Sequence, residues 1–235
     1  MNKYIIIVTF IIGIGIGISL YIIFRTTENF HETILKNKGA KKYNTNKAII
    51  YTLDNFLTDE ECDKVIEISN TNLIPSKITT YNPDMYFRTS YTCEFNNINK
   101  KHRKYIDFIE NKICNLIEID NSLSEVIQSQ KYEVGQEFKL HTDFFTPNTY
   151  EYTKNCSKQG NRTWTIMIYL KNTEEGGETT FPKIPLTFKP KKGMAIIWNN
   201  LNDNGIGNDN TLHCGKPIIK GNKFIITKWF RQLPR

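Results

Sequence analysis

The second half of this chain consists of short apolar runs separated by turn residues, and this pattern restricts its fold more than any other feature. The runs cover residues 126–134, 163–170, 179–181, 195–198 and 223–230. Glycines such as Gly193 and Gly221 stand just before two of them. Several short strands joined by glycine turns predict a β-sandwich or barrel. The chain has no repeat with a period of about 20–50 residues, which excludes a solenoid.

The first half has a pattern that is typical of helices. Residues 48–53 predict one strand, and Thr58 followed three residues later by Glu61 forms a capping box that opens a helix. A second helix is predicted over about residues 101–119, where apolar residues recur at helical spacing. We therefore predict an α+β fold in which helices precede a β-barrel.

The chain begins with an apolar run that is long enough to cross a bilayer. Residues 4–24 carry no charge and lie between Lys3 and Arg25. A helix of this length is about 30 Å long, which matches the hydrocarbon core of a membrane. A cleaved signal peptide has a shorter apolar core and a small-residue cleavage site. We therefore predict a transmembrane signal anchor over residues 1–24.

Polar residues without apolar periodicity follow, and they predict a stalk over residues 25–47. The folded domain is then expected over residues 48–235, which is long enough for a real core. The basic residues of the stalk favour a cytosolic domain by the positive-inside rule. Glycosylation sequons at Asn155 and Asn161 are no more frequent than chance predicts, so they do not indicate a lumen.

Composition and charge exclude several other classes of protein. The 235 residues carry a net charge of +7, and 39% of them are hydrophobic. This hydrophobic content excludes a disordered chain. The basic residues are dispersed, so we expect no nucleic-acid partner. Five cysteines without a C-x-x-C pair argue against a zinc knuckle and leave the disulfide pairing open.

Two of the four histidines stand in a pattern that can bind iron. His141 and Asp143 are two residues apart, so on a strand their side chains point to the same face. His213, from a distant strand, can complete the set. Two imidazoles and one carboxylate leave coordination positions open, which is the arrangement of non-haem Fe(II) oxygenases. We therefore predict that these three residues bind Fe(II).

Lys223 is a candidate for binding a co-substrate. It begins an apolar strand, where a buried ammonium is costly unless an anion accompanies it. A dicarboxylate would supply that anion, and Tyr132 could offer its hydroxyl to the same carboxylate. The alternative is a lysine whose ammonium reaches water at the end of the strand.

In combination these motifs resemble the prolyl 4-hydroxylase family. The resemblance extends in order and spacing over residues 48–233. The matching segments are Asn55–Cys62, Tyr132–Gln136, His141–Phe145, Arg162–Lys171, Glu175–Pro182, Lys192–Ala195 and His213–Trp229. Two positions depart from the family pattern. Cys214 stands where a small residue is common, and Lys216 stands where many members have a cysteine, which calls the family's usual disulfide there into question.

The resemblance implies a double-stranded β-helix, or jelly roll, and an Fe(II)- and 2-oxoglutarate-dependent dioxygenase. It implies three kinds of site residue. These are the iron ligands His141, Asp143 and His213, the 2-oxoglutarate-binding residues Lys223, Tyr132 and Thr165, and Trp229 near the substrate proline. It also implies O₂ as the second co-substrate and L-ascorbate as the reductant that rescues oxidised iron.

The implied reaction is hydroxylation of peptidyl proline to 4-hydroxyproline in proline-rich or collagen-like polypeptides. It is coupled to oxidative decarboxylation of 2-oxoglutarate to succinate and CO₂. Hydroxylation of lysine is a related alternative, although many lysyl hydroxylases carry Arg where this chain has Lys223. A non-catalytic, membrane-anchored structural barrel is an alternative of another class.

The expected location is a membrane, crossed once, with the domain facing the lumen of the endoplasmic reticulum by family resemblance. A cytosol-facing or virion-associated domain stays open, because the amino-acid usage is typical of an AT-rich genome such as that of a giant virus. The sequence does not determine the oligomeric state. It also leaves open the role of a polar insertion at residues 146–161, which could form a lid over the peptide groove.

Overall fold

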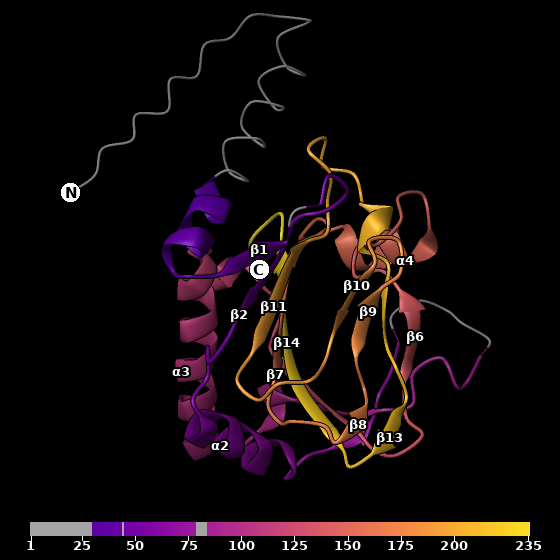
Figure 1. Cartoon of the computed structure of the whole chain (residues 1–235). Helices are drawn as coiled ribbons and strands as arrows, with labels where there is room; N and C mark the ends of the chain where they lie inside the picture. Colours follow the sequence, from indigo (N-terminus) through magenta and orange to yellow (C-terminus); the bar gives the residue numbers. More distant parts are fainter. Residues whose placement is uncertain (1–29, 44, 79–83) are drawn as a thin grey trace, which may run out of the picture.

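The computed structural model describes residues 30–43, 45–78 and 84–235 (Figure 1). Within these residues, no helix combines the length and the apolar character that crossing a membrane requires. The predicted anchor at residues 1–24 lies outside the described residues.

The two long helices lie in the first half of the chain, as predicted, but short strands also lie between them and a further short helix lies in the second half. The helices are α2 (Asp59–Ser69), α3 (Lys100–Ile117) and α4 (Tyr150–Cys156), with 3₁₀ turns at Phe95–Asn97, Asn121–Leu123 and Asp209–Thr211. The strands are β1 (Lys41–Tyr43), β2 (Ile50–Leu53), β3 (Ile74–Pro75), β4 (Tyr91–Glu94), β5 (Gln128–Tyr132), β6 (Phe138–His141), β7 (Arg162–Tyr169), β8 (Glu175–Gly176), β9 (Thr179–Phe181), β10 (Leu186–Phe188), β11 (Ala195–Asn199), β12 (His213–Gly215), β13 (Ile218–Lys220) and β14 (Lys223–Arg231).

Local signals explain where the two long helices begin. The capping box at α2 forms as predicted, because Thr58 accepts a hydrogen bond from the Glu61 amide and Glu61 accepts one from the Thr58 amide. At α3 the Asn99 side chain accepts from the His102 amide, and Glu118 ends the helix in a left-handed conformation. Both helices bury one apolar face, which fixes them against the sheet.

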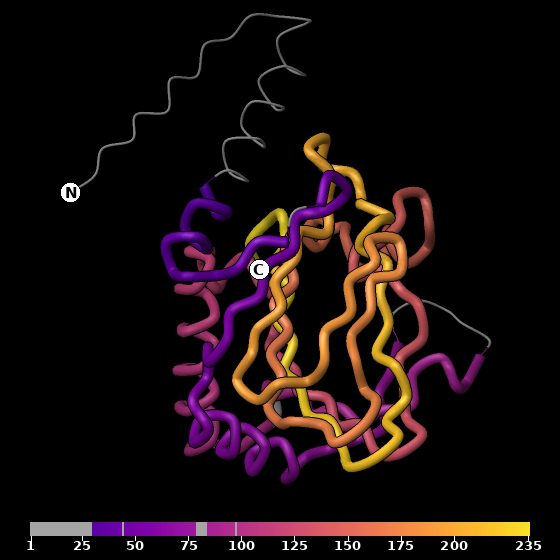
Figure 2. The backbone as a smooth tube through the Cα atoms, viewed as in Figure 1, coloured from indigo at the N-terminus to yellow at the C-terminus, as the bar shows by residue number. Residues whose placement is uncertain are grey.

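The strands form two facing antiparallel sheets. The large sheet has the order β1-β2-β11-β7-β14-β5-β4-β3, and the smaller one has the order β10-β9-β12-β6. A short pair of strands, β13 and β8, joins their lower ends in the view of Figure 2. Neighbours in a sheet are often distant in sequence, as β2 beside β11 shows, so the predicted runs alone could not give the strand order.

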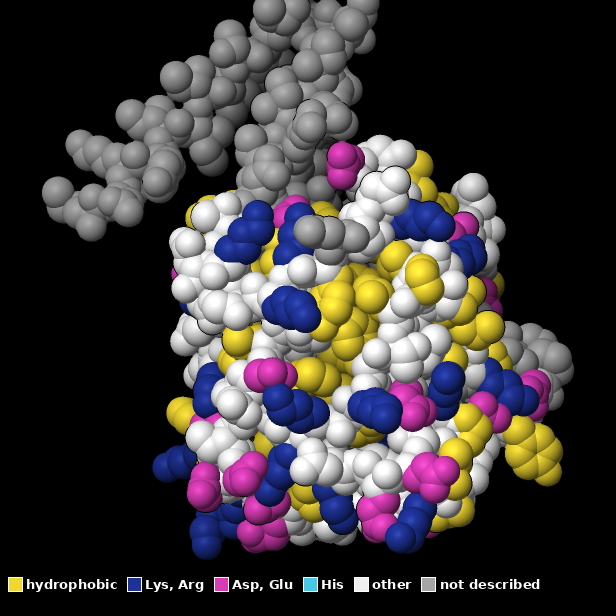
Figure 3. Space-filling model, in the orientation of Figure 1, with side chains coloured by type: hydrophobic (Ala, Val, Ile, Leu, Met, Phe, Trp, Pro, Cys, Tyr) yellow, Lys and Arg dark blue, Asp and Glu magenta, His cyan; other side chains and the backbone are white. Residues whose placement is uncertain are grey.

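Two separate apolar cores lie on the two faces of the large sheet. Helices α2 and α3 cover the outer face, and the second core fills the space between the sheets. In the orientation of Figure 1, the space-filling view in Figure 3 shows hydrophobic side chains gathered where this space opens at the edge. Strand β14 is therefore buried along its whole length, although four of its nine residues, namely Lys223, Thr227, Lys228 and Arg231, are polar or charged.

The predicted stalk and the structure differ over residues 30–43. Residues 30–37 are helical, and β1 pairs with β2 at the edge of the large sheet. Leu35 is fully buried in the outer core, and the His31 ring nitrogen Nδ1 lies 2.8 Å from the Ile117 carbonyl oxygen. The folded domain thus includes residue 30, ahead of the expected boundary at 48. The segment is short, so its few apolar residues gave no periodic signal.

All five cysteines belong to the described residues, and all five are free thiols. Four of them are buried, and Cys214 is half-buried on β12. The doubt that the sequence raised about a disulfide near Cys214 therefore agrees with the structure.

Candidate metal centre

The three residues predicted to bind iron lie together between the two sheets. His141 ends β6 and His213 begins β12, and the two are paired directly across these antiparallel strands. Asp143 follows β6 by two residues, and its carboxylate oxygen Oδ1 lies 4.0 Å from His141 Nε2. One ligand atom from each residue falls within 4.8 Å of the others. Strand pairing therefore joins ligands that are far apart in the sequence.

The orientation of both imidazole rings is fixed by the backbone. Nδ1 of His141 lies 2.7 Å from the Lys139 carbonyl oxygen, and Nδ1 of His213 lies 2.9 Å from that of Thr211. A carbonyl oxygen accepts only, so each Nδ1 carries a proton and Nε2 is the nitrogen of each ring that is placed to bind a metal ion. Such outer hydrogen bonds are typical of histidines that bind metals.

The charge states of the cluster also suit a metal ion. Burial, together with the charge of His213, lowers the pKa of His141 to about 3, so this ring is neutral at neutral pH. Burial alone would raise the pKa of Asp143, but nearby His213, His141 and Arg162 outweigh it and lower the pKa. Neutral imidazole and ionised carboxylate are the forms that bind a divalent cation. The residues present therefore fit Fe(II).

Thr165 lies beneath the cluster on β7 and contacts a ligand directly. Its hydroxyl donates to Asp143 Oδ2 at 2.7 Å, and it accepts from the Asn200 side-chain amide at 2.8 Å. Since a threonine hydroxyl has one proton, this proton is used on Asp143. The family resemblance implied that Thr165 binds 2-oxoglutarate, and that role stays a prediction. In the structure Thr165 positions a metal ligand.

Lys223 lies at the end of the same cavity, which we call the inner pocket. This pocket has a volume of about 50 Å³, and its lining includes His141, Asp143, His213, Tyr132 and Lys223. The Lys223 ammonium is buried, donates to the Gly177 carbonyl oxygen at 2.8 Å, and lies 5.3 Å from the centre of the Tyr132 ring. Burial lowers the pKa of Lys223 to about 7. The alternative, in which the Lys223 ammonium reaches water at the end of the strand, does not fit this burial.

Thr179 also lines the inner pocket, and the sequence analysis did not single it out. Its hydroxyl oxygen accepts a hydrogen bond from the Tyr169 hydroxyl at 2.7 Å, and its side chain is buried. The Tyr169 hydroxyl therefore holds the Thr179 side chain at the wall of the pocket. Its only sequence signal was the matching segment after Gly176-Gly177.

Trp229 lies on β14 between the inner pocket and a second cavity, which we call the outer groove. The groove has a volume of about 220 Å³ and extends from Asp143 and Trp229 to Ile74 on the edge strand β3. Arg162 stacks on the Trp229 ring at 4.0 Å, and its guanidinium donates to Glu125 at 2.6 and 2.7 Å. This placement leaves the predicted contact of Trp229 with a substrate open as a prediction.

Comparison with known proteins finds a matching family model and several relatives of this chain. Residues 127–231 match the family model described as the 2OG-Fe(II) oxygenase superfamily. Two proteins of Arabidopsis thaliana, Probable prolyl 4-hydroxylase 8 and Prolyl 4-hydroxylase 5, are 33% and 30% identical to this chain over 207 residues. Each alignment covers 78% of this chain and 68% of the relative.

Solved structures show the same architecture. The viral collagen prolyl hydroxylase of Paramecium Bursaria Chlorella virus-1, in complex with 2OG, has a TM-score of 0.60 and 28% identity, and the match covers 78% of this chain and 96% of that one. A Trichoplax adhaerens prolyl hydroxylase that holds a peptide of hypoxia inducible factor has the same TM-score at 14% identity, which shows a shared fold. The mixed fold of antiparallel strands is therefore that of these oxygenases.

Proposed function

Because this chain belongs to the prolyl 4-hydroxylase family of 2OG-Fe(II) oxygenases, we propose that it hydroxylates proline in a polypeptide. The reaction consumes O₂ and 2-oxoglutarate and yields 4-hydroxyproline, succinate and CO₂. The observation that carries the proposal is the three-residue metal cluster and the buried Lys223 in one pocket. The substrates that fit are proline-rich or collagen-like chains, because the viral relative is named for collagen.

The residues of this chain divide the work of binding. His141, Asp143 and His213 hold Fe(II), which when bound supplies the chemistry that activates O₂. The Lys223 ammonium would pair with the far carboxylate of 2-oxoglutarate, and the hydroxyl of Tyr132, whose ring lies near Lys223, would donate a hydrogen bond to the same carboxylate. L-ascorbate is the expected reductant, as is typical of prolyl hydroxylases.

Aromatic side chains around the cluster keep water away and the ligands in place. Phe138 stacks on the His141 ring at 3.5 Å, and Phe181 stacks on the His213 ring at 5.2 Å. Trp198 meets the His213 ring edge-on at 5.0 Å. A dry, rigid pocket favours a single reaction at the substrate and limits unwanted oxidation of the protein.

The two alternatives from the sequence have less support. The two Arabidopsis relatives and the viral structure are named as prolyl hydroxylases, and none of these three names indicates lysine as substrate. A structural barrel would not need three metal ligands with oriented lone pairs and a buried lysine in the same cavity.

We further propose that residues 4–24 anchor the domain in a membrane, on the strength of their length and apolar character alone. The proposed domain division is an anchor, a connecting segment and a catalytic domain. Endoplasmic reticulum, cytosol and virion remain the candidate locations of the domain. Carbonate extraction of the expressed chain tests the anchor, and protease protection of sealed vesicles tells a lumenal domain from a cytosolic one.

Mass spectrometry tests the reaction. The detergent-solubilised full chain is incubated with proline-rich peptides, Fe(II), 2-oxoglutarate and ascorbate. We expect a gain of one oxygen atom on proline, identified as 4-hydroxyproline after hydrolysis, together with one succinate per hydroxyl. The His213→Ala variant is the control, because it removes one of the three protein ligands. Oxygen on lysine instead, or full activity of this variant, would contradict the proposal.

A further inference from the structure

A third cavity borders the metal cluster on the side of α4, and we call it the side hollow. It has a volume of about 280 Å³, and its walls include Phe87, Phe144, Phe145 and Leu212. It shares His141, Thr142 and Phe87 with the outer groove. Phe144 and Leu212 each neighbour a metal ligand in sequence, namely Asp143 and His213. The hollow therefore borders both the metal cluster and the outer groove.

The polar insertion at residues 146–161 forms the outer wall of this hollow. Thr149 caps helix α4 by accepting a hydrogen bond from the Tyr152 amide. The far end of the insertion is tied down by Arg231, which donates to the carbonyl oxygens of Asn155 and Gly160 at 2.7 and 2.8 Å. These bonds make the insertion a fixed wall.

The aromatic floor of the hollow is held just as firmly. The side chain of Asn161 accepts from the Phe145 amide at 2.9 Å and donates to the Phe145 carbonyl oxygen at 2.8 Å. Behind Phe144 lies Gly207, where an added Cβ would come within 2.2 Å of the phenyl ring. Only glycine at position 207 lets the Phe144 ring lie where it does, so the shape of the hollow depends on it.

We propose that the side hollow binds an apolar side chain of the polypeptide substrate, one or two residues from the target proline. The inference rests on the proposed function and adds a sequence preference to it. Successive residues of an extended chain are about 3 Å apart, so a neighbour of the target proline reaches a hollow that touches the metal ligands. Phenyl and leucine walls favour an apolar side chain, such as a second proline.

The rim of the hollow adds a preference against negative charge. Glu151, in the first turn of α4, lines the cavity and is half-buried. An acidic side chain of the substrate would lose its water against the aromatic walls and meet the Glu151 carboxylate. The hollow therefore selects for apolar and against acidic neighbours of the target proline.

A set of peptides tests this preference with the full-length enzyme. Each peptide carries one target proline, and the two residues on either side are replaced in turn by proline, leucine, alanine or glutamate. We expect kcat/KM at one of these positions to be about tenfold or more higher for proline or leucine than for glutamate. Equal values at all four positions would overturn the inference while leaving proline hydroxylation intact, whereas no hydroxylation of any peptide would contradict the proposed function.

Two variants assign the preference to this hollow. Glu151→Lys should improve the glutamate peptide relative to the leucine peptide by about two- to fivefold, while Glu67→Lys, a charge reversal on the exposed face of α2, should not. Gly207→Ala should push Phe144 into the hollow and reduce the advantage of leucine. Peptide-independent turnover of 2-oxoglutarate reports whether the metal site is intact in each variant. An unchanged ratio in both Glu151→Lys and Gly207→Ala would refute the assignment.

Discussion

Strand β14 carries two buried lysines whose surroundings are opposite. Lys223 and Lys228 are five residues apart, so their side chains point to opposite faces of the large sheet. Lys223 faces the inner pocket, and Lys228 faces helix α3 in the outer core. Their side chains are almost equally buried, yet they differ in what the protein offers to the ammonium.

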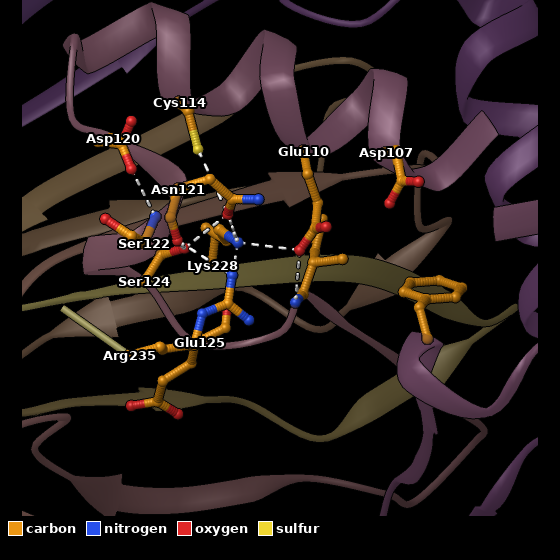
Figure 4. A network of polar contacts seen from close by, with 12 residues as sticks. Asp107, Glu110, Cys114, Asp120, Asn121, Ser122, Ser124, Glu125, Lys228 and Arg235 are labelled. Atoms are coloured by element: carbon orange, nitrogen blue, oxygen red, sulfur yellow. Dashed lines mark hydrogen bonds and ion pairs between the residues drawn. The ribbon is translucent and has the colours of Figure 1, made fainter. Parts of the chain in front are cut away.

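Lys228 is completely paired by the protein. Its ammonium donates to the Glu110 carboxylate at 2.9 Å, to the Asn121 side chain at 2.8 Å and to the Glu125 carbonyl oxygen at 2.8 Å, as Figure 4 shows. Glu110 also accepts from Arg103 at 3.1 Å and from the Ile127 amide at 3.1 Å. Every proton of the ammonium has an acceptor, so this lysine joins α3 to the sheet.

The Lys223 ammonium donates to the Gly177 carbonyl oxygen, and among the described residues no carboxylate lies within ion-pair distance of it. Burial lowers its pKa to about 7 because little compensates the desolvated charge. The protein supplies a carboxylate to Lys228, and this lysine therefore stabilises the fold. We expect the carboxylate that pairs with Lys223 to come from a ligand instead.

The largest expected effect comes from removing Lys223. Lys223→Ala should weaken 2-oxoglutarate binding by about 3–5 kcal/mol, or a few hundred-fold or more in Kd, because the ligand carboxylate is then buried without a partner. Lys223→Arg should restore part of the affinity, since charge is kept but the guanidinium is larger and planar. Calorimetric titration with 2-oxoglutarate measures both, and Fe(II) titration should give nearly unchanged affinity. An unaltered Kd for 2-oxoglutarate in Lys223→Ala would break the comparison.

Removing Lys228 should lower the stability of the protein and leave 2-oxoglutarate binding unchanged. Lys228→Met leaves the buried Glu110 carboxylate with only Arg103 and an amide, which should lower the free energy of unfolding by about 3 kcal/mol. The Kd for 2-oxoglutarate should stay the same. Urea unfolding of both lysine variants tests the contrast, because Lys223→Ala removes an uncompensated charge and should not destabilise. If both variants destabilised equally, the distinction between the two lysines would be lost.

Thr165 differs from Lys223, because it is a buried polar group on the pocket face to which the protein itself supplies hydrogen-bond partners. Thr165→Val keeps the shape and removes the hydrogen bond to Asp143, so Fe(II) affinity should fall about 10- to 100-fold. The effect on 2-oxoglutarate affinity, measured with the metal site saturated, should be small. A large loss of 2-oxoglutarate affinity with normal Fe(II) binding would instead favour a role of Thr165 in binding 2-oxoglutarate, as the family resemblance implied.

The smallest expected effect is a pH dependence of 2-oxoglutarate binding. With a pKa of about 7, free Lys223 is mostly neutral at pH 8, and the bound carboxylate draws a proton onto it. The Kd should therefore rise by up to about tenfold per pH unit above 7. Calorimetry at pH 8 in two buffers of different ionisation enthalpy should show uptake of about one proton per ligand. In Lys223→Arg the side chain stays charged, so residue 223 should take up no proton when the ligand binds. Equal proton uptake in both proteins would exclude Lys223 as the group that takes up the proton.

The same pKa predicts a sign for stability. The folded pKa of Lys223 lies below that of an unfolded lysine, so the unfolded chain binds more protons between about pH 7 and 10.5. The free energy of unfolding that Lys223 contributes should thus rise with pH between about pH 7 and 10.5. Its contribution to stability is therefore smallest below pH 7. Urea midpoints of the ligand-free protein, compared with Lys223→Met, isolate this contribution.

Residue types and their local spacing were enough to predict the chemistry of this protein. Residue type and spacing predicted His141, Asp143 and His213 as one metal set, and the structure brings them together. The family, its oxygenase reaction and its cofactors followed from motif order, and the comparisons confirm them. These features are local: a two-residue spacing on a strand, a capping box or a glycine turn has the same physical meaning in any fold.

The tertiary structure alone decided which face each polar side chain of β14 meets and what meets it there. In the sequence, Lys223 and Lys228 are both charged residues within one strand. Only the contacts of β14 with its neighbouring strands and with α3 show that Lys228 is paired by Glu110 and that Lys223 has no carboxylate partner among the described residues. The role of residues 30–43, the place of Thr165 under Asp143 and the side hollow behind α4 were hidden for the same reason. Each depends on contacts between residues that are distant in sequence. Such contacts form, and stabilise the protein, only when the sheets have folded against one another.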